Sequence, residues 1–260
     1  KSADVQDYAL SHRALARRAA AAGIVLLKNE DGILPLVPQS SVALYGAGVT
    51  KTIKGGTGSG DVNERHSVNV YEGMKEAGFH VTNEAWIEGY EADYRKARQE
   101  WKQRVLAKNA LGSGAGLDFF MAYAATPFYL PVGPEVTKTE ADTAIYVISR
   151  IAGEGADRYA IGGDYTLSEE EDRILSSICA LYEKVVVLIN TGGIIDLSFL
   201  DKLHVSALVY FVQGGEEGGN ALADVLSGKK NFSGRLATSW AYRFEDIPSN
   251  TTYSYLGGDK

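Results

Sequence analysis

Short apolar runs alternate with longer polar or amphipathic stretches along most of the chain. The runs of strand length lie at 24–29, 41–46, 79–82, 143–149, 184–190, 205–211 and 234–240. The stretches with helical character lie at 3–22, 67–77, 84–110, 168–183, 194–200 and 216–228. Apolar runs without polar alternation are typical of strands that are buried on both faces of a sheet. The alternation predicts an α/β fold, with a mostly parallel sheet covered by helices on both faces as an α/β sandwich.

Local signals support several of these boundaries. The Ala-rich stretch 3–22 is followed by Gly23, and glycine is common just past a helix C-terminus. Ser168, followed three residues later by Glu171, has the pattern of a capping box at the start of a helix. The segment near 84–140 is predicted as a helical and irregular insertion, in which a long charged helix at 84–110 precedes an irregular stretch.

Composition and charge narrow the class of protein. A chain of 260 residues can form one large domain or two small ones. The formal net charge is -7 and no long block of Lys or Arg is present, so we expect no nucleic-acid partner. No apolar run reaches the roughly 18 to 20 residues that a membrane span needs, so we expect no membrane partner.

Cysteine and histidine residues give little support for disulfide or metal chemistry. Cys179 is the one cysteine, so an internal disulfide framework is excluded. A single cysteine is compatible with a reducing compartment, and we favour a cytoplasmic chain, with secretion as the alternative. The histidines lack metal-ligand spacing, and we predict no metal and no cofactor. They are His12, His66, His80 and His204.

The loop after the predicted strand 143–149 places one carboxylate between two glycines. In the stretch SRIAGEGADR, Glu154 is flanked by Gly153 and Gly155. Glycines remove side-chain bulk and let another surface approach the backbone closely. This arrangement suits a general acid, which has to reach a leaving-group oxygen in an enclosed site. The alternative is a solvated surface loop in which the glycines only make the turn.

A second glycine-rich loop, GGTGSGD at 55–61, follows the predicted strand 41–46. It lacks the Gly-Lys-Ser/Thr ending of a P-loop and a clean G-x-G-x-x-G spacing, so a flavodoxin-like nucleotide binder is a weak alternative. Ser59 and Asp61 are candidates to bind sugar hydroxyls, or they only stabilise the turn. Both loops follow strands, and sites in such sheets form beyond the carboxyl ends of strands.

Charged residues next to the two loops are candidates for supporting roles. Asp157 and Arg158 follow the Gly-Glu-Gly sequence, and Asp164 follows a Gly-Gly pair. We interpret these three as a loop-fixing ion pair or turn. Arg65 follows the glycine-rich loop and is a candidate to line a domain interface, whereas Lys54 is interpreted as a solvated charge.

Six motifs occur together in an order that is more specific than any one of them. They are AAAAGIVLLKNEDGILPL (19–36), IKGGTGSGDVN (53–63), SRIAGEGADR (149–158), GGDYTLSEEE (162–171), VVVLINTGGIIDLSFL (185–200) and VQGGEEGGNALADVLSGKKNFSGRLATSW (212–240). In this order they resemble the α/β-sandwich domain of family 3 glycoside hydrolases, chiefly β-glucosidases. The resemblance covers nearly the whole chain except roughly 84–140, where that family varies.

The resemblance implies a retaining β-glucosidase whose site is shared by two domains. Residues 1–260 then form the sandwich domain, and a TIM-like barrel supplies the aspartate nucleophile, usually within a Ser-Asp-Trp motif. The matching positions make Glu154 the acid/base residue and Ser59 a residue of the glucosyl pocket. Asp61, Arg65, Asp157 and Arg158 are the residues that we expect to support the site loops.

The sequence departs from the family in one respect that matters for activity. No Ser-Asp-Trp motif occurs, because Trp86, Trp101 and Trp240 do not follow aspartates. The barrel is absent from this chain, so we expect the chain to be inactive without it. The expected partners are a β-glucoside substrate and a barrel domain, in the same or a separate chain. The exposed surface that would face the barrel also makes a homo-oligomer an open prediction.

Alternatives remain inside and outside this class. Within it, the enzyme is a β-xylosidase or another β-glycosidase. Outside it, the chain is a non-catalytic carbohydrate-binding module. The aromatic residues of the insertion either form a local core or act as a lid that stacks on the leaving-group sugar. They are Phe119, Phe120, Tyr123, Phe128 and Tyr129.

Overall fold

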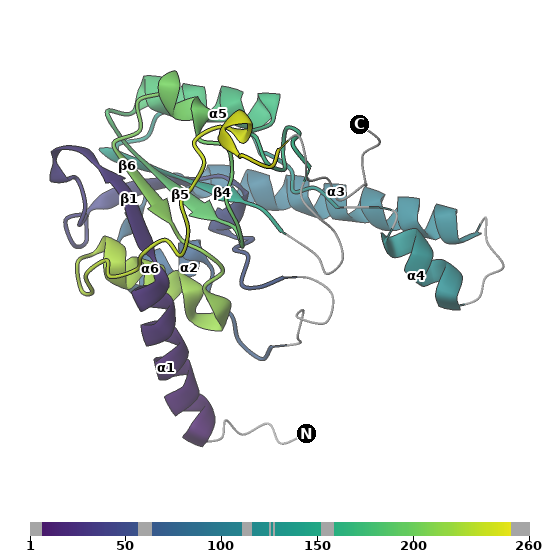
Figure 1. Ribbon diagram of the computed structural model, residues 1–260. Helices are drawn as coiled ribbons and strands as arrows, with labels where there is room; N and C mark the ends of the chain where they lie inside the picture. Colours follow the sequence, from purple (N-terminus) through teal and green to yellow (C-terminus); the bar gives the residue numbers. More distant parts are fainter. Residues whose placement is uncertain are drawn as a thin grey trace.

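A computed structural model describes residues 7–56, 64–110, 116–124, 126, 128–151 and 159–250. In this part of the chain the strands form one six-stranded sheet with the order β1-β6-β5-β4-β2-β3 (Figure 1). All neighbouring strands are parallel except β1 and β6, which are antiparallel. The strands are β1 Val25–Asn29, β2 Ser41–Tyr45, β3 His80–Val81, β4 Thr143–Ser149, β5 Lys184–Asn190 and β6 Ala207–Tyr210. The prediction of a mostly parallel sheet is confirmed.

The centre of the sheet explains why its strands read as continuous apolar runs. Every residue of β4 is buried, and every residue of β5 except Lys184. The two strands pair over their full length, with Val147 opposite Leu188. Each fully buried aliphatic side chain contributes about 1.5–3 kcal/mol to folding. Helices on both faces therefore cover these strands (Figure 1).

One face of the sheet is covered by α2, α6 and the end of α1 (Figure 1). The bounds of these helices are α1 Asp7–Gly23, α2 Val70–Glu76 and α6 Gly218–Leu226. Helices α2 and α6 approach so closely that a Cβ atom on Gly219 would overlap the carbonyl oxygen of Asn69. Arg17 of α1 donates two hydrogen bonds to Asp224 of α6, at 2.6 and 2.8 Å. Glycine at 219 is thus required by helix packing.

The opposite face is covered by α5, Glu169–Leu181, and by the first half of α3, Glu84–Ala110. Tyr45 at the end of β2 connects these helices to the sheet. Its ring meets Trp86 of α3 edge-on, and its hydroxyl lies 2.9 Å from that of Tyr182, which follows α5. Burial and this hydrogen bond raise the pKa of Tyr45, so its hydroxyl stays protonated inside the core.

The insertion forms a projecting arm, which comprises the second half of α3 (95–110), α4 (Gly116–Ala124) and the segment up to Tyr129 (Figure 1). We expected the part after 110 to be irregular, and the helix α4 corrects that expectation. The arm has a small core of its own, in which Trp101 and Val105 of α3 pack with Ala122 of α4. An apolar α4 is stable here because Trp101 and its neighbours offer it a surface to cover.

Two predicted elements differ from the structure. No strand forms at 234–240, where every residue except Gly234 and Trp240 is exposed and a strand would bury little. The predicted helix at 194–200 is limited to a short 3-10 turn at Ser198–Asp201. The carboxylate of Asp196 accepts hydrogen bonds from the backbone of Ser198 and of Phe244, and residues 194–197 are not helical.

Candidate active site at the carboxyl edge of the sheet

Most of the residues that the sequence nominated lie outside the described residues. These are Ser59, Asp61, Glu154, Asp157 and Arg158. The structure describes the anchors of the two loops that carry them, up to Gly56 and from Glu64 in one loop, and up to Ile151 and from Tyr159 in the other. Arg65, the remaining nominated residue, is described and exposed.

The two loops start from neighbouring strands. Strands β2 and β4 are parallel and in direct register, with Tyr45 opposite Tyr146. Both loops therefore depart from the same carboxyl edge of the sheet. The turn after β2 packs against the end of β4, where a Cβ atom on Gly48 would overlap the hydroxyl of Ser149. This close packing brings the starts of the two loops together.

Asn190, at the carboxyl end of β5, ties three segments of this edge to one another. Its amide nitrogen donates to the carbonyl oxygens of Ile53 and Val212, at 2.9 and 2.6 Å. Its amide oxygen accepts from the backbone N–H of Ile53 at 2.6 Å and from the hydroxyl of Ser149 at 3.2 Å. The side chain is fully buried, and both its donors and both its acceptor positions are occupied. It fixes the start of the glycine-rich loop relative to β4 and β6.

The backbone at the end of β6 is strained at this same place. Val212 has a φ of 59°, in the left-handed region that β-branched residues rarely adopt. The hydrogen bond from Asn190 to its carbonyl oxygen helps to hold this conformation. Such strain persists only where the surroundings determine it, and it gathers at functional sites. The carboxyl edge therefore has a recognised mark of a functional site.

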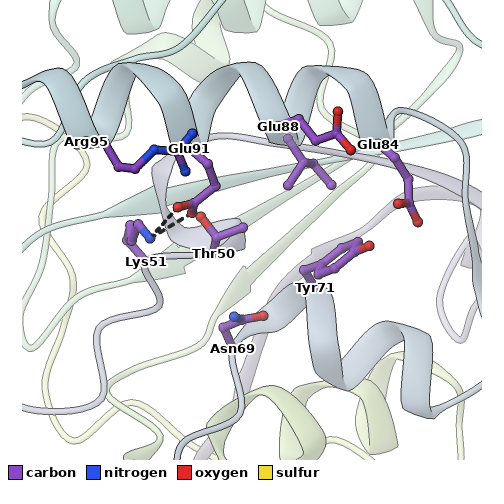
Figure 2. A pocket seen from close by; sticks show the side chains of 9 residues that line it. Thr50, Lys51, Asn69, Tyr71, Glu84, Glu88, Glu91 and Arg95 are labelled. Atoms are coloured by element: carbon purple, nitrogen blue, oxygen red, sulfur yellow. Dashed lines mark hydrogen bonds and ion pairs between the residues drawn. The ribbon is translucent and has the colours of Figure 1, made fainter.

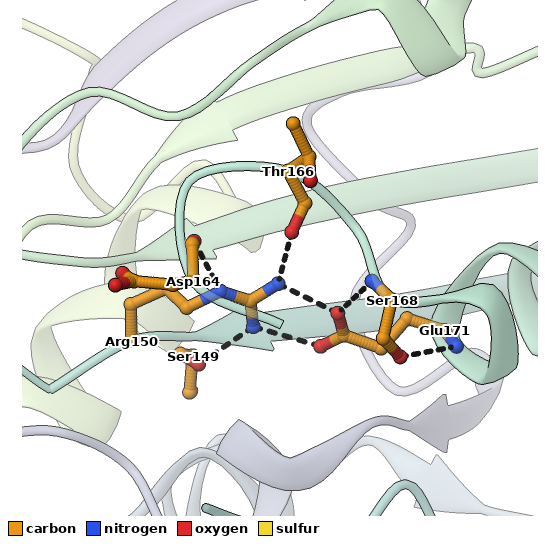
Figure 3. Close-up of polar contacts among 6 residues, drawn as sticks. All are labelled: Ser149, Arg150, Asp164, Thr166, Ser168 and Glu171. Atoms are coloured by element: carbon orange, nitrogen blue, oxygen red, sulfur yellow. Dashed lines mark hydrogen bonds and ion pairs between the residues drawn. The ribbon is translucent and has the colours of Figure 1, made fainter. Parts of the chain in front are cut away.

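Arg150 holds the Glu154-bearing loop at its start (Figure 3). Its Nη1 and Nη2 atoms form a two-pronged ion pair with Glu171 of α5, at 2.7 and 2.6 Å. The guanidinium also donates to backbone carbonyl oxygens on both sides of the loop. These contacts are Nε to Asp164 at 2.7 Å, Nη1 to Ser149 at 2.9 Å and Nη2 to Thr166 at 3.4 Å. Both limbs of the loop are therefore tied to one side chain.

Glu171 is itself fixed by the predicted capping box, which the structure confirms. The hydroxyl of Ser168 accepts from the backbone N–H of Glu171 at 3.1 Å, and the carboxylate of Glu171 accepts from the N–H of Ser168 at 2.9 Å. Asp164 has the turn role that we expected. Its carboxylate accepts from the N–H of Tyr159 at 2.7 Å, at the point where the loop returns.

The returning limb of the glycine-rich loop is anchored by charge and backbone contacts. Lys54 forms an ion pair with Glu64 across the base of the loop, and the Lys54 ammonium lowers the pKa of Glu64. The interpretation of Lys54 as a merely solvated charge is therefore wrong. His66 lies 3.4 Å from the buried carboxylate of Glu217, which also accepts from Asn220. These contacts attach the loop to the start of α6.

A polar cavity of about 390 Å³ lies beside the start of the glycine-rich loop, between α2 and α3 (Figure 2). Lys51 and Glu91 form an ion pair across it, at 2.7 Å, and Lys51 also lies over the ring of Tyr94. Burial raises the pKa of Glu91, but hydrogen bonds from Lys51 and Thr50 outweigh it and lower the pKa overall. The cavity is lined by the first half of α3, and its lining reaches the start of the arm at Arg95.

Sequence reasoning missed the two residues that organise this edge, Arg150 and Asn190. Each follows or ends an apolar run, so the signal was a lone polar residue at the carboxyl end of a predicted buried strand. Such a residue has to satisfy its polar groups inside the protein, because burial without partners is costly. Position at the end of a buried strand is therefore the feature that would have identified them.

The described part of the chain lacks two classes of feature. Across it, no group of three or more His, Cys, Asp and Glu side chains is arranged to hold a metal ion. Within the same ranges, no helix combines the length and the apolar character that crossing a membrane requires.

The aromatic residues of the insertion divide between the two interpretations. Phe128 packs with Trp101, and Tyr123 meets Trp101 edge-on, so these two belong to the core of the arm or its border. Phe119 and Tyr129 are about half exposed, at 46% and 57%. The local-core interpretation is confirmed for Phe128, whereas Tyr123 is 47% exposed at the border of the arm core. The side chain of Phe120 lies outside the described residues.

The fold defines an α/β-sandwich domain with a candidate site at the carboxyl edge of its sheet, where the two loops are anchored. Residues 24–260 match the glycosyl hydrolase family 3 C-terminal domain. The chain belongs to this family. The resemblance that the six motifs indicated is confirmed.

Relatives agree with this assignment. The chain is 33% identical to β-glucosidase A of Butyrivibrio fibrisolvens, over 92% of this chain and 30% of that protein. It is 29% identical to the thermostable β-glucosidase B of Acetivibrio thermocellus, over 92% of this chain and 27% of that protein. Among solved structures, β-glucosidase 3B of Thermotoga neapolitana in complex with α-D-glucose superposes with a TM-score of 0.74 and 32% identity, over 95% of this chain and 33% of that chain. The chain spans about a third of the length of these proteins.

Proposed function

We propose that this chain is the domain of a retaining β-glucosidase that supplies the acid/base glutamate, Glu154, to a site shared with a barrel domain. The observation that carries the proposal is the joint anchoring of two loops at one edge of the sheet. The loop that contains Glu154 and the loop that contains Ser59 leave neighbouring parallel strands, and Asn190 bonds to the start of both. The names of the relatives give independent support.

The chemistry divides between two carboxyl groups. The barrel aspartate attacks the anomeric carbon while Glu154 gives its proton to the glycosidic oxygen, so the aglycone leaves as a neutral alcohol. Glu154, now a carboxylate, removes a proton from a water molecule that attacks the glucosyl-enzyme and releases glucose. The two carboxyl groups have to lie about 5 to 5.5 Å apart for this retaining route.

The roles of the other nominated residues follow from their positions in the sequence. Ser59 binds a hydroxyl of the glucosyl unit, and Asp61 and Arg65 support its loop. Asp157 and Arg158 support the loop of Glu154. Glucose is the proposed sugar, and xylose is the first alternative, because the barrel would form most of the pocket for the reacting sugar.

The test uses the parent enzyme together with its barrel. In the Glu154→Ala variant, kcat/KM for an alkyl β-glucoside should fall by about 100-fold to 10,000-fold, the usual worth of a general acid. Hydrolysis of 2,4-dinitrophenyl β-glucoside should retain most of its kcat/KM, because that leaving group departs without a proton. Azide should accelerate turnover of the second substrate and yield β-glucosyl azide.

The control is Glu170→Ala, which removes an exposed carboxylate from α5. This variant should leave kcat/KM unchanged for both substrates. The 260-residue chain alone should release no product. An alkyl β-glucoside that Glu154→Ala hydrolyses at the normal rate would place the acid elsewhere. If in addition the chain binds sugars but no variant of it alters hydrolysis, the carbohydrate-binding module is the better assignment. Preference for an aryl β-xyloside over the glucoside would select the β-xylosidase.

A further inference from the structure

We infer that Arg150 is a positioning residue for the acid/base glutamate, and that its ion pair with Glu171 sets where the Glu154 loop is held. This inference rests on the proposed role of Glu154. It assigns a function to a side chain that lies inside the motif SRIAGEGADR but that the sequence analysis did not nominate.

The contacts of Arg150 leave none of its hydrogen-bonding capacity unused. An arginine side chain has five N–H groups, and five acceptors are present around this one (Figure 3). The residue is 7% exposed, and the side chain of Glu171 is 13% exposed. The guanidinium is therefore committed to the protein, and it acts on substrate through the backbone that it holds.

The acceptors lie on three different pieces of chain. Ser149 ends β4 where the loop departs, Asp164 and Thr166 lie on the limb that returns, and Glu171 is in the first turn of α5. Only an arginine can serve them together, because its planar fork matches a carboxylate while Nε points to another group. A lysine has three donors on a single atom and cannot span these positions.

The anchors also explain why the effect should reach Glu154. Beyond Arg150, the departing limb is described as far as Ile151, and the returning limb begins at Tyr159, whose N–H is held by the Asp164 carboxylate. The carbonyl of the same Asp164 receives Nε of Arg150. Arg150 therefore connects the two ends of the short segment that contains Glu154. Loosening this connection changes the distance between the ends and displaces the carboxyl group.

A structural role alone makes a different prediction from a positioning role. Loss of folded enzyme would lower kcat/KM by the same factor for every substrate. Displacement of an acid lowers it only for substrates whose leaving group needs a proton. A misplacement of about 1 Å can cost about 100-fold in rate. The ratio of rates for two leaving groups therefore separates the two roles.

The experiment compares Arg150→Lys with wild type in the parent enzyme that contains the barrel. We expect kcat/KM for an alkyl β-glucoside to fall by about 100-fold, while that for 2,4-dinitrophenyl β-glucoside changes by less than about 3-fold. Azide should accelerate turnover of the dinitrophenyl substrate in the variant, because azide attacks the glucosyl-enzyme without a general base and displaces the barrel carboxylate. Glu171→Gln, which can keep the capping box, should show the same pattern with a loss of about 10-fold.

Arg173→Lys is the matched control, because Arg173 lies on α5 in an exposed pair with Glu135, and it should leave both substrates unchanged. Equal losses for both substrates, or no loss for either, in folded Arg150→Lys and Glu171→Gln would overturn the inference. Glu154→Ala is measured in parallel. If it shows the leaving-group pattern and the Arg150 variant does not, only the positioning role fails. If it lacks the pattern, the proposed function fails first.

Discussion

The carboxyl edge of the sheet and the α3–α4 arm are stabilised by different kinds of buried contact. At the edge, Asn190 and Arg150 are buried polar side chains whose partners come from several distant segments. In the arm, a few apolar residues around Trp101 pack with one another, and Arg98 stacks on that ring at 4.0 Å. The edge belongs to the main core, whereas the arm has a core of its own.

This difference bears on how each region should respond to damage. A polar group that bonds several segments transmits its loss to all of them, so the edge should unfold with the whole sheet. A small separate core opens by itself at a lower free energy than global unfolding. The contrast teaches that buried polar contacts fix the ends of the two loops relative to the sheet, whereas the arm is stabilised by its own apolar contacts.

The largest loss of stability is expected at the carboxyl edge of the sheet. Asn190→Leu leaves the Ile53 N–H, two carbonyl groups and the Ser149 hydroxyl without their partner. Each unsatisfied buried group costs about 1–3 kcal/mol, so the free energy of unfolding should fall by at least about 4 kcal/mol. Urea denaturation followed by far-ultraviolet circular dichroism measures this loss.

Asn29 offers a matched control for that variant. It also ends a strand and forms a paired contact with the backbone of one residue, Leu34, at 3.0 Å in both directions. It lies on an edge strand and is only partly buried. Asn29→Leu should therefore cost about 1 kcal/mol. If both variants lost the same free energy of unfolding, the number of segments that an asparagine side chain connects would not determine its contribution to stability.

An intermediate effect is expected in the arm. Trp101→Ala removes the ring that contacts Tyr123 and Phe128 and that donates to the carbonyl of Thr126 at 2.6 Å. The free energy of local opening of the arm should fall by about 3 kcal/mol. Hydrogen exchange should become faster in the second half of α3 and in α4, with β4 and β5 unchanged. Faster exchange in the central strands as well would show that the arm and the sheet unfold together.

The smallest effect is expected at the junction of the two regions, where Lys51 and Glu91 pair. Both side chains are about a quarter exposed, so Lys51→Met should lower the free energy of unfolding by at most about 1 kcal/mol. The pKa of Glu91 is lowered in the folded chain, so the pair stabilises above the ordinary value of 4.5 and loses its effect as the pH falls through the lowered pKa. The difference between wild type and variant should therefore shrink in acid, and a constant difference would argue against the pair.

The sheet could be predicted from the sequence because its central strands are buried on both faces. A strand such as β4, buried at every position, has no polar alternation, and an apolar run of this short length bounded by polar residues is typical of such a strand. The capping box of Ser168 and Glu171 was likewise predictable because it is local. Helix α4 was missed, because its apolar sequence becomes helical by packing on Trp101, which lies in another helix. The segment 234–240 was mistaken for a strand because its composition resembles one.

The candidate site was predictable only in part, for a related reason. The position of the Glu154 loop after a buried strand could be read from the sequence, and so could the turn role of Asp164. The network around Arg150 joins residues 14 to 21 positions apart, and Asn190 bonds a residue 137 positions away. The topology of the sheet determines which distant residues become partners, so a local sequence pattern cannot predict these contacts.

The antiparallel direction of β1 has a consequence for how a second domain can be tethered. Val25, at the start of β1, lies opposite Tyr210 at the carboxyl end of β6. The chain thus enters the sheet from the edge that bears the site loops, through α1. At the other end, Phe244 packs on Tyr165 of the loop that follows β4. A second domain attached next to either of these two described points would be held at a high effective concentration beside that edge.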